Sequence, residues 1–136
     1  MKCLLDTNVL ISASLFPQSV PARAFMAAAT FPNEAVICDY SIDEMRRVYN
    51  RKFPRKIHVM EEFLSVALIS AEVIAVPPED ESIADEASIR DIGDRPILRA
   101  AVASDAEALI TGDRDFLESG LKRPTILTPA DFLAFG

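Results

Sequence analysis

Acidic side chains follow several short apolar runs of this 136-residue chain. Asp6 directly follows the first run, Asp39 directly follows Ala35–Cys38, and Asp113 comes three residues after another run ends at Ile110. Short apolar runs are typical of strands buried in a parallel sheet, whose carboxyl ends share one edge, so we expect these acids to lie close together. The full set expected at this edge is Asp6, Asp39, Glu44, Asp94, Asp113 and Asp115.

Carboxylates within a few ångströms of one another raise each other's pKa and cost stability unless a cation neutralises them. Mg²⁺ or Mn²⁺ suits such a set, because hard divalent cations prefer oxygen ligands. The one histidine, His58, excludes a zinc site made of several imidazoles, and we expect it on a helix surface. Cys3 and Cys38 lie in apolar runs without CxxC spacing and are expected to be buried free thiols. Any chemistry must therefore depend on carboxylates.

Each acid also has a purely structural interpretation. Ser41 and Glu44 fit the S-x-x-E pattern of a capping box, in which Glu44 would only stabilise the start of a helix. Asp94 and Asp113 are suitable residues for helix N-caps. Asp6 is less easily explained in this way, since Thr7 or Asn8 would cap a following helix better, and we expect Asp6 to be functional.

Apolar runs alternate along the chain with segments that have the spacing or the caps of helices. Strands are expected at residues 2–6, 35–38, 72–76, 108–110 and 125–127. Helices are expected at residues 9–16, 20–30, 41–53, 56–70, 95–104 and from 128 onward, with a possible helical turn around 83–89. This alternation predicts an α/β fold with a central parallel sheet of about five strands, covered by helices on both faces.

The length and composition fit one globular domain over residues 1–136, with 50% hydrophobic and 26% charged residues. No apolar stretch approaches the roughly 18 to 20 residues that span a bilayer. Asp6 interrupts what would have to be the apolar core of a signal peptide. We therefore expect a cytoplasmic protein that does not enter a membrane.

The net charge of −7 is unevenly distributed. Residues 1–75 carry eight basic and eight acidic side chains, whereas residues 76–136 carry six and thirteen. Six of the fourteen basic residues fall within positions 46–56, and Arg47, Arg51 and Arg55 repeat every four residues as one stripe of a helix would. A solvated helix face explains such a stripe, and so does a surface that meets the phosphates of a nucleic acid.

Four blocks together resemble the PIN-domain family, in the right order and across the chain. They are Leu-Leu-Asp6-Thr7-Asn8-Val, Ser41-Ile-Asp-Glu44-Met-Arg-Arg, Asp91-Ile-Gly-Asp94-Arg-Pro, and Leu-Ile-Thr111-Gly112-Asp113-Arg-Asp115. Among PIN proteins, the chain is most similar to the VapC-like toxins of bacterial toxin–antitoxin pairs. The resemblance implies a three-layer α/β/α fold and a metal-dependent ribonuclease.

The resemblance also implies roles for individual residues. Asp6, Glu44, Asp94 and Asp113 would form the catalytic, metal-binding acidic site, with Mg²⁺ or Mn²⁺ as the cofactor. Asn8 and Thr111 match residues that orient these carboxylates or the attacking water, and Asp91 and Asp115 are additional acids near matched positions. The implied partners are an RNA substrate, a cognate antitoxin protein and a second copy of the chain in a homodimer.

Other functions remain open at this level. A haloacid-dehalogenase-like phosphatase would need a second Asp two positions after the first, where this chain has Asn8. A receiver-like signalling module would need an acceptor Asp after the third strand, where this chain has Pro77-Pro78. A PIN fold that binds RNA or a partner without cutting is the main non-enzymatic alternative.

Overall fold

The computed structural model describes residues 1–79, 89 and 92–135. Five parallel strands form one sheet in the order β3-β2-β1-β4-β5. They are β1 (Lys2–Leu5), β2 (Glu34–Cys38), β3 (Glu72–Ile74), β4 (Ala108–Ile110) and β5 (Thr125–Leu127). Strand β1 lies in the middle, with Leu4 paired to Val36 of β2 and to Leu109 of β4.

The chain changes direction across the sheet at β1. From β1 it proceeds outward through β2 to β3, and then crosses back to add β4 and β5 on the other side of β1. In parallel sheets of this kind the residues that bind ligands gather beyond the carboxyl ends of the strands at this switch point. The turns after β1 and β4 are therefore the positions where a site is expected.

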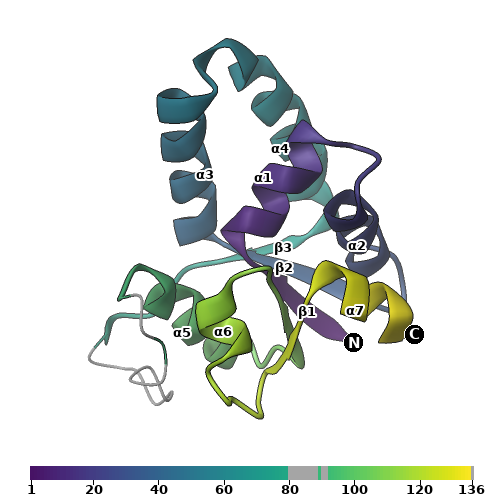
Figure 1. Ribbon diagram of the computed structural model, residues 1–136, viewed down its shortest axis with the longest axis vertical. Coiled ribbons are helices and arrows are strands. Elements are labelled where there is room, and N and C mark those ends of the chain that lie inside the picture. The colour runs from purple at the N-terminus through teal and green to yellow at the C-terminus, as the bar shows by residue number, and fades with distance from the viewer. Residues whose placement is uncertain (80–88, 90–91, 136) are drawn as a thin grey trace.

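Helices cover both faces of the sheet, as predicted (Figure 1). Alternate side chains of β1 divide between two hydrophobic cores, with Cys3 and Leu5 in one and Leu4 in the other. The first core contains residues of α1 (Thr7–Leu15), α2 (Val20–Ala28), α3 (Asp39–Lys52), α4 (Ile57–Ser70) and α7 (Pro129–Phe135). The second contains residues of α5 (Arg95–Ala103) and α6 (Arg114–Leu117).

Two 3-10 turns complete the described elements, η1 (Pro54–Lys56) and η4 (Ile92–Asp94). Through η1, helices α3 and α4 form a hairpin that projects away from the sheet, with its turn at the top of Figure 1. Among the described residues, no helix is long and apolar enough to cross a membrane.

The predicted elements are present, with small shifts at their ends. Helix α1 begins at Thr7 and α3 at Asp39, each two residues earlier than expected. Strand β3 ends at Ile74, because Pro77 and Pro78 follow and Val76 already bonds to the side chain of Asp39. The short helix α6 was not predicted as an element, and the helical turn expected around residues 83–89 falls almost entirely outside the described residues.

Candidate active site

Asp6 sits at the end of the central strand with its side chain almost completely buried. Its Oδ1 accepts a hydrogen bond from the backbone N–H of Thr7 at 2.7 Å, and its Oδ2 accepts one from the Thr111 hydroxyl at 2.7 Å. It is the N-cap of α1, so the expectation that Asp6 would not cap a helix is wrong. Because α1 starts at Thr7, the residue before it is in the N-cap position.

Burial raises the pKa of Asp6 to about 6 from its ordinary value of 3.8. The hydrogen bonds from Thr111 and Thr7 favour the ionised form and limit this rise, while the charges of Asp113 and Glu44 add to it. Because Asp113 and Glu44 both act on the pKa of Asp6, carboxylates from three separate chain segments lie near one another. The charges of Asp113 and Glu44 therefore lie close enough to Asp6 to influence its pKa.

Two polar side chains attach the turn after β4 to Asp6. Thr111 is fully buried, donates to Asp6 and accepts a bond from the backbone N–H of Asp113 at 2.9 Å. The Asn8 side chain donates to Asp6 Oδ2 at 3.4 Å and accepts from the Gly112 N–H at 3.3 Å. The two residues predicted as supporting groups, Asn8 and Thr111, thus contact both loops of the site.

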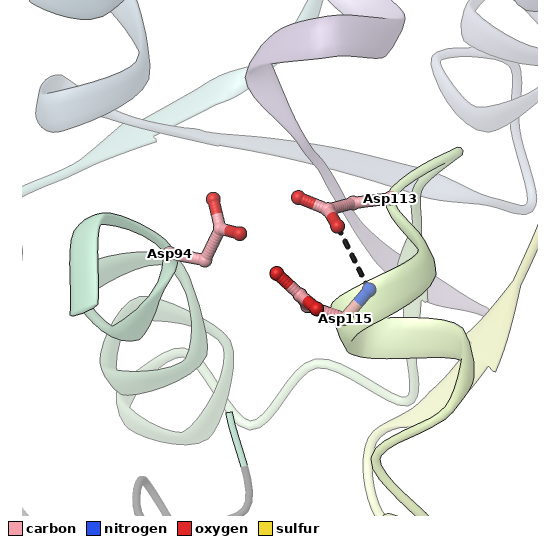
Figure 2. Close-up of side chains that lie close together, drawn as sticks. All are labelled: Asp94, Asp113 and Asp115. Carbon is pink, nitrogen blue, oxygen red and sulfur yellow. Dashed lines mark hydrogen bonds between the residues drawn. The ribbon is translucent and has the colours of Figure 1, made fainter. Parts of the chain in front are cut away.

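Three carboxylates form a tight cluster beside Asp6. Asp94, Asp113 and Asp115 each offer an oxygen within 4.8 Å of the others, and all three are half-buried. Figure 2 shows their carboxyl groups around one common space, with Asp94 coming from the start of α5 and the other two from the start of α6. Of the four predicted metal ligands, this cluster contains Asp94 and Asp113, together with Asp115 as an additional member.

The local geometry of α6 explains why Asp115 joins the cluster. Asp113 caps this helix, and its Oδ1 accepts a bond from the Asp115 N–H at 2.9 Å. The cap turns the chain so that two acids separated by one residue face the same space. Asp94 occupies the N-cap position of α5, as its structural interpretation predicts, but its side chain makes no cap bond. Asp91 lies outside the described residues.

Glu44 does not belong to a capping box. Helix α3 begins at Asp39, its cap residue is Cys38, and no side chain caps it. Ser41 therefore lies inside the helix, where its buried hydroxyl accepts a 2.9 Å bond from the Thr7 hydroxyl and contacts Cys38 Sγ at 3.3 Å. This link between α1 and α3 could not be predicted from the sequence, because hydroxyl residues at a helix start usually indicate a cap.

The three arginines predicted as one stripe occupy different environments. Arg47 lies over the ring of Tyr40, 5.8 Å from its centre, and Arg51 is exposed farther along α3. Arg55 is exposed in η1, beyond the end of α3 at Lys52. The prediction of a single helical stripe is wrong for Arg55, because Pro54 ends the regular helix before that position.

Neither cysteine provides an alternative nucleophile. Both thiols are free and buried, as predicted, and burial raises the pKa of Cys3 to about 11. A thiol with such a pKa is protonated at neutral pH and is a poor nucleophile. His58 is exposed on α4, also as predicted.

The donor set of the site consists of oxygen atoms. Three half-buried carboxylates on two rigid helix starts, and a fourth held by Thr111, fit a hard divalent cation and do not fit a soft metal. The same group of like charges is unfavourable without a positive ion. The residues therefore suit Mg²⁺ or Mn²⁺ on chemical grounds.

Comparisons with known proteins agree with this architecture. A family model described as "PIN domain" matches residues 2–115. No curated protein matches the chain.

Two solved structures share the fold. The structure of VapBC2 from Rickettsia felis, bound to a DNA fragment from their promoter, matches with a TM-score of 0.70 and 16% identity, covering 94% of this chain and 98% of that one. PAE2754 from Pyrobaculum aerophilum matches with a TM-score of 0.69 and 17% identity, covering 98% of this chain and 88% of that one. With a family model that spans most of its length, the chain belongs to the PIN domain family.

Proposed function

We propose that this protein is an endoribonuclease that hydrolyses RNA phosphodiester bonds with Mg²⁺ or Mn²⁺. The observation that carries the proposal is the cluster of Asp94, Asp113 and Asp115 at the carboxyl edge of the sheet, within 4.8 Å of one another. Asp6, Glu44, Asp94 and Asp113 are proposed as the catalytic and metal-binding acids, with Asp115 as a further ligand. Asp91 remains a proposed supporting acid on the sequence alone.

A divalent cation held by these carboxylates would supply a nucleophilic water at neutral pH and neutralise charge on the phosphate. The residues of the chain position this chemistry. Thr111 fixes Asp6 from one side and the Asp113 backbone from the other, so the two acids keep a constant separation. Asn8 connects Asp6 to the Gly112 backbone and restrains the same turn. Preorganised carboxylates lose little entropy when the reaction begins.

RNA would reach the acids along α3. Arg47 and Arg51 lie on this helix after Glu44, and Arg55 lies in the turn that follows, so all three are proposed to contact substrate phosphates. Exposed arginines along a helix that starts at the acidic site would attract an anionic strand, which the carboxylates alone would repel.

The likeness to VapBC2 also supports a biological setting. We propose that residues 1–136 act as one PIN-like domain, the toxin component of a toxin–antitoxin pair, in the cytoplasm. A small antitoxin would bind it, and the toxin would form a homodimer. Light scattering should then give a mass near twice the 14.9 kDa of one chain, and a monomeric mass at micromolar concentrations would contradict the dimer.

The experiment that tests the activity is cleavage of a mixed pool of single-stranded RNA with Mg²⁺ or Mn²⁺, with EDTA as the metal-free control. Asp113→Asn keeps an oxygen that can cap α6 but removes a charge from the cluster, so cleavage should fall by at least a hundredfold, about 2.7 kcal/mol. Asp43→Asn removes the same charge from an exposed position of α3 and should cut at the wild-type rate.

Cleavage that resists EDTA, or that is equal in both variants, would contradict the proposal. A protein that binds RNA without cutting it under any of these conditions would support the non-catalytic alternative.

A further inference from the structure

The turn between α3 and α4 carries a group of cations with no ion pair among the described residues. The cations are Arg51, Lys52, Arg55 and Lys56, and together with Phe53 they are here called the arm tip. The two arginines nearer the sheet have local partners, since Arg46 pairs with Glu61 of α4 and Arg47 lies over Tyr40. No acidic residue occurs between positions 45 and 60. Four exposed positive charges therefore gather on a protein whose net charge is −7.

The arm tip is also hollowed. Residues 52–56 line a cavity of about 280 Å³, with Lys52, Arg55 and Lys56 providing charge and Phe53 an apolar surface. The Phe53 ring is half-buried and packs edge-on against Tyr49, with 5.6 Å between ring centres. Pro54 restricts the backbone at the first position of η1. A half-buried ring and a proline turn thus lie beside the exposed cations that line the cavity.

We propose that the arm tip is a second contact site for single-stranded RNA, separate from the acidic site. It would bind the part of the strand that flanks the cleaved bond. This inference rests on the proposed ribonuclease function and adds to it where the substrate is anchored. Glu44 lies on α3 and Phe53 directly follows the last residue of that helix, which places them about 14 Å apart along its axis at 1.5 Å per residue. A strand held at both ends would therefore extend a few nucleotides beyond the bond that is cut.

The chemistry of the arm tip favours a single-stranded nucleic acid over other anions. Binding sites for single strands combine cations that contact the backbone with an aromatic side chain against which a base can pack. An anionic membrane would match the charges, but the tip offers only one aromatic side chain and it is half-buried. An acidic protein segment would match the charges but would not need the cavity beside Phe53.

Equilibrium binding in EDTA tests the arm tip without any cleavage. A labelled single-stranded RNA of about ten nucleotides would be titrated with protein at salt concentrations between about 50 and 200 mM, with fluorescence anisotropy as the readout. Arg55→Gln/Lys56→Gln removes two charges from the tip. Arg23→Gln/Lys122→Gln removes two exposed charges elsewhere, on α2 and before β5, and is the matched control.

The tip variant should raise the Kd about tenfold near 0.1 M salt and reduce the slope of log K against log salt by about 1.4, the value for two phosphate contacts of a single strand. The control should leave both quantities at their wild-type values. Phe53→Leu removes no charge and should raise the Kd without changing the slope. Both charge variants change exposed side chains only, so their melting temperatures should match that of the wild type.

Equal losses in the tip variant and the control would overturn the inference, because the charge would then act only through the net charge of the protein. It would also be overturned if the tip variant bound RNA as the wild type does while losing binding to anionic lipid vesicles or to an acidic peptide. A tip that binds RNA in EDTA, in a protein that cuts no RNA with Mg²⁺ or Mn²⁺, would leave this inference standing and reject the proposed function.

Discussion

Asp6 is buried and accepts three hydrogen bonds, and burial and hydrogen bonding shift its pKa in opposite directions. Removal from water favours the neutral acid, whereas the bonds from Thr111, Thr7 and Asn8 favour the carboxylate. The balance is a pKa of about 6, so the metal-free protein holds this group partly protonated just below neutral pH. A cation that needs the carboxylate must displace that proton, which links metal affinity to pH.

The raised pKa of Asp6 predicts a stability change with pH. A carboxyl whose folded pKa lies above its unfolded value of 3.8 makes folding less favourable as pH rises, with the loss complete above about pH 6. Asp6→Asn keeps the shape of the side chain and one of its two acceptor oxygens, and it has no charge. In EDTA, its unfolding free energy relative to wild type should therefore rise by up to about 3 kcal/mol between pH 4 and pH 7.

Denaturant unfolding at several pH values measures this difference, and effects of the acids that do not interact with Asp6 cancel between the two proteins. A difference that stays constant with pH would show that Asp6 titrates normally. Asp131→Asn, which removes the same charge at an exposed position of α7, is the matched control.

Thr111 predicts a second change at the residue scale. Thr111→Val keeps the shape of the side chain but removes the hydroxyl that donates to Asp6 and accepts from the Asp113 N–H. A buried acceptor and a backbone donor then lose their partner, so stability should fall by about 1 to 3 kcal/mol. Thr125→Val in β5 changes an exposed hydroxyl and should shift the denaturation midpoint little. Equal denaturation midpoints for the two variants would show that the Thr111 hydroxyl does not stabilise the fold by linking Asp6 to Asp113.

The element scale shows what sequence patterns could and could not predict. The strands were predicted nearly to the residue, because short apolar runs bounded by polar residues have few other interpretations. The positions of the acids at the strand ends were predicted from the same pattern. The capping box did not form, because Asp39 already occupies the first turn of α3, where its Oδ1 accepts bonds from the backbone N–H groups of Tyr40 and Val76. The added bond to Val76, in the segment after β3, cannot be predicted from the local sequence.

The sequence predicts Asp115 at the carboxyl edge of the sheet, but not how closely it approaches Asp94 and Asp113. Its place in the carboxylate cluster depends on the four-residue helix α6 and on the Asp113 cap, and helices this short have no periodic pattern to detect. The order of the strands likewise depends on long-range pairing, which no local window contains.

The contact between α1 and α3 leads to a prediction that separates Ser41 from Glu44. Ser41→Ala leaves the buried Thr7 hydroxyl without its acceptor, so stability should fall by about 1 to 2 kcal/mol while the folded protein still cuts RNA. Glu44→Gln should melt near the wild-type temperature but lose metal-dependent cleavage, because an amide is a poor ligand for a hard cation. Melting curves and cleavage rates on the same preparations measure both effects.

Glu62→Gln is the matched control for Glu44, since Glu62 is exposed on α4. A Glu44→Gln protein that cuts RNA as the control does would remove Glu44 from the catalytic group. A Ser41→Ala protein as stable as wild type would show that the hydrogen bond between Thr7 of α1 and Ser41 of α3 is not needed for stability.

At the scale of the whole molecule, the charge is arranged in two zones. The acidic cluster lies at the carboxyl edge of the sheet, and the arm tip lies at the far end of the α3–α4 hairpin (Figure 1). Residues 76–136 hold thirteen of the twenty-one acids, so the second half of the chain carries the negative zone. This separation lets one molecule attract an anionic strand at one end and a divalent cation at the other.

If the carboxylate cluster binds a divalent metal as proposed, we expect the stability of the whole protein to depend on that metal. A cation that binds the folded chain and not the unfolded one adds about 2.7 kcal/mol at a concentration of one hundred times its Kd. Mg²⁺ or Mn²⁺ should therefore raise the melting temperature by several degrees over a sodium salt of equal ionic strength. Asp113→Asn and Asp115→Asn should reduce this rise, because each removes a charge from the cluster of three. Asp131→Asn should retain the full rise, and equal rises in all four proteins would place the bound metal elsewhere.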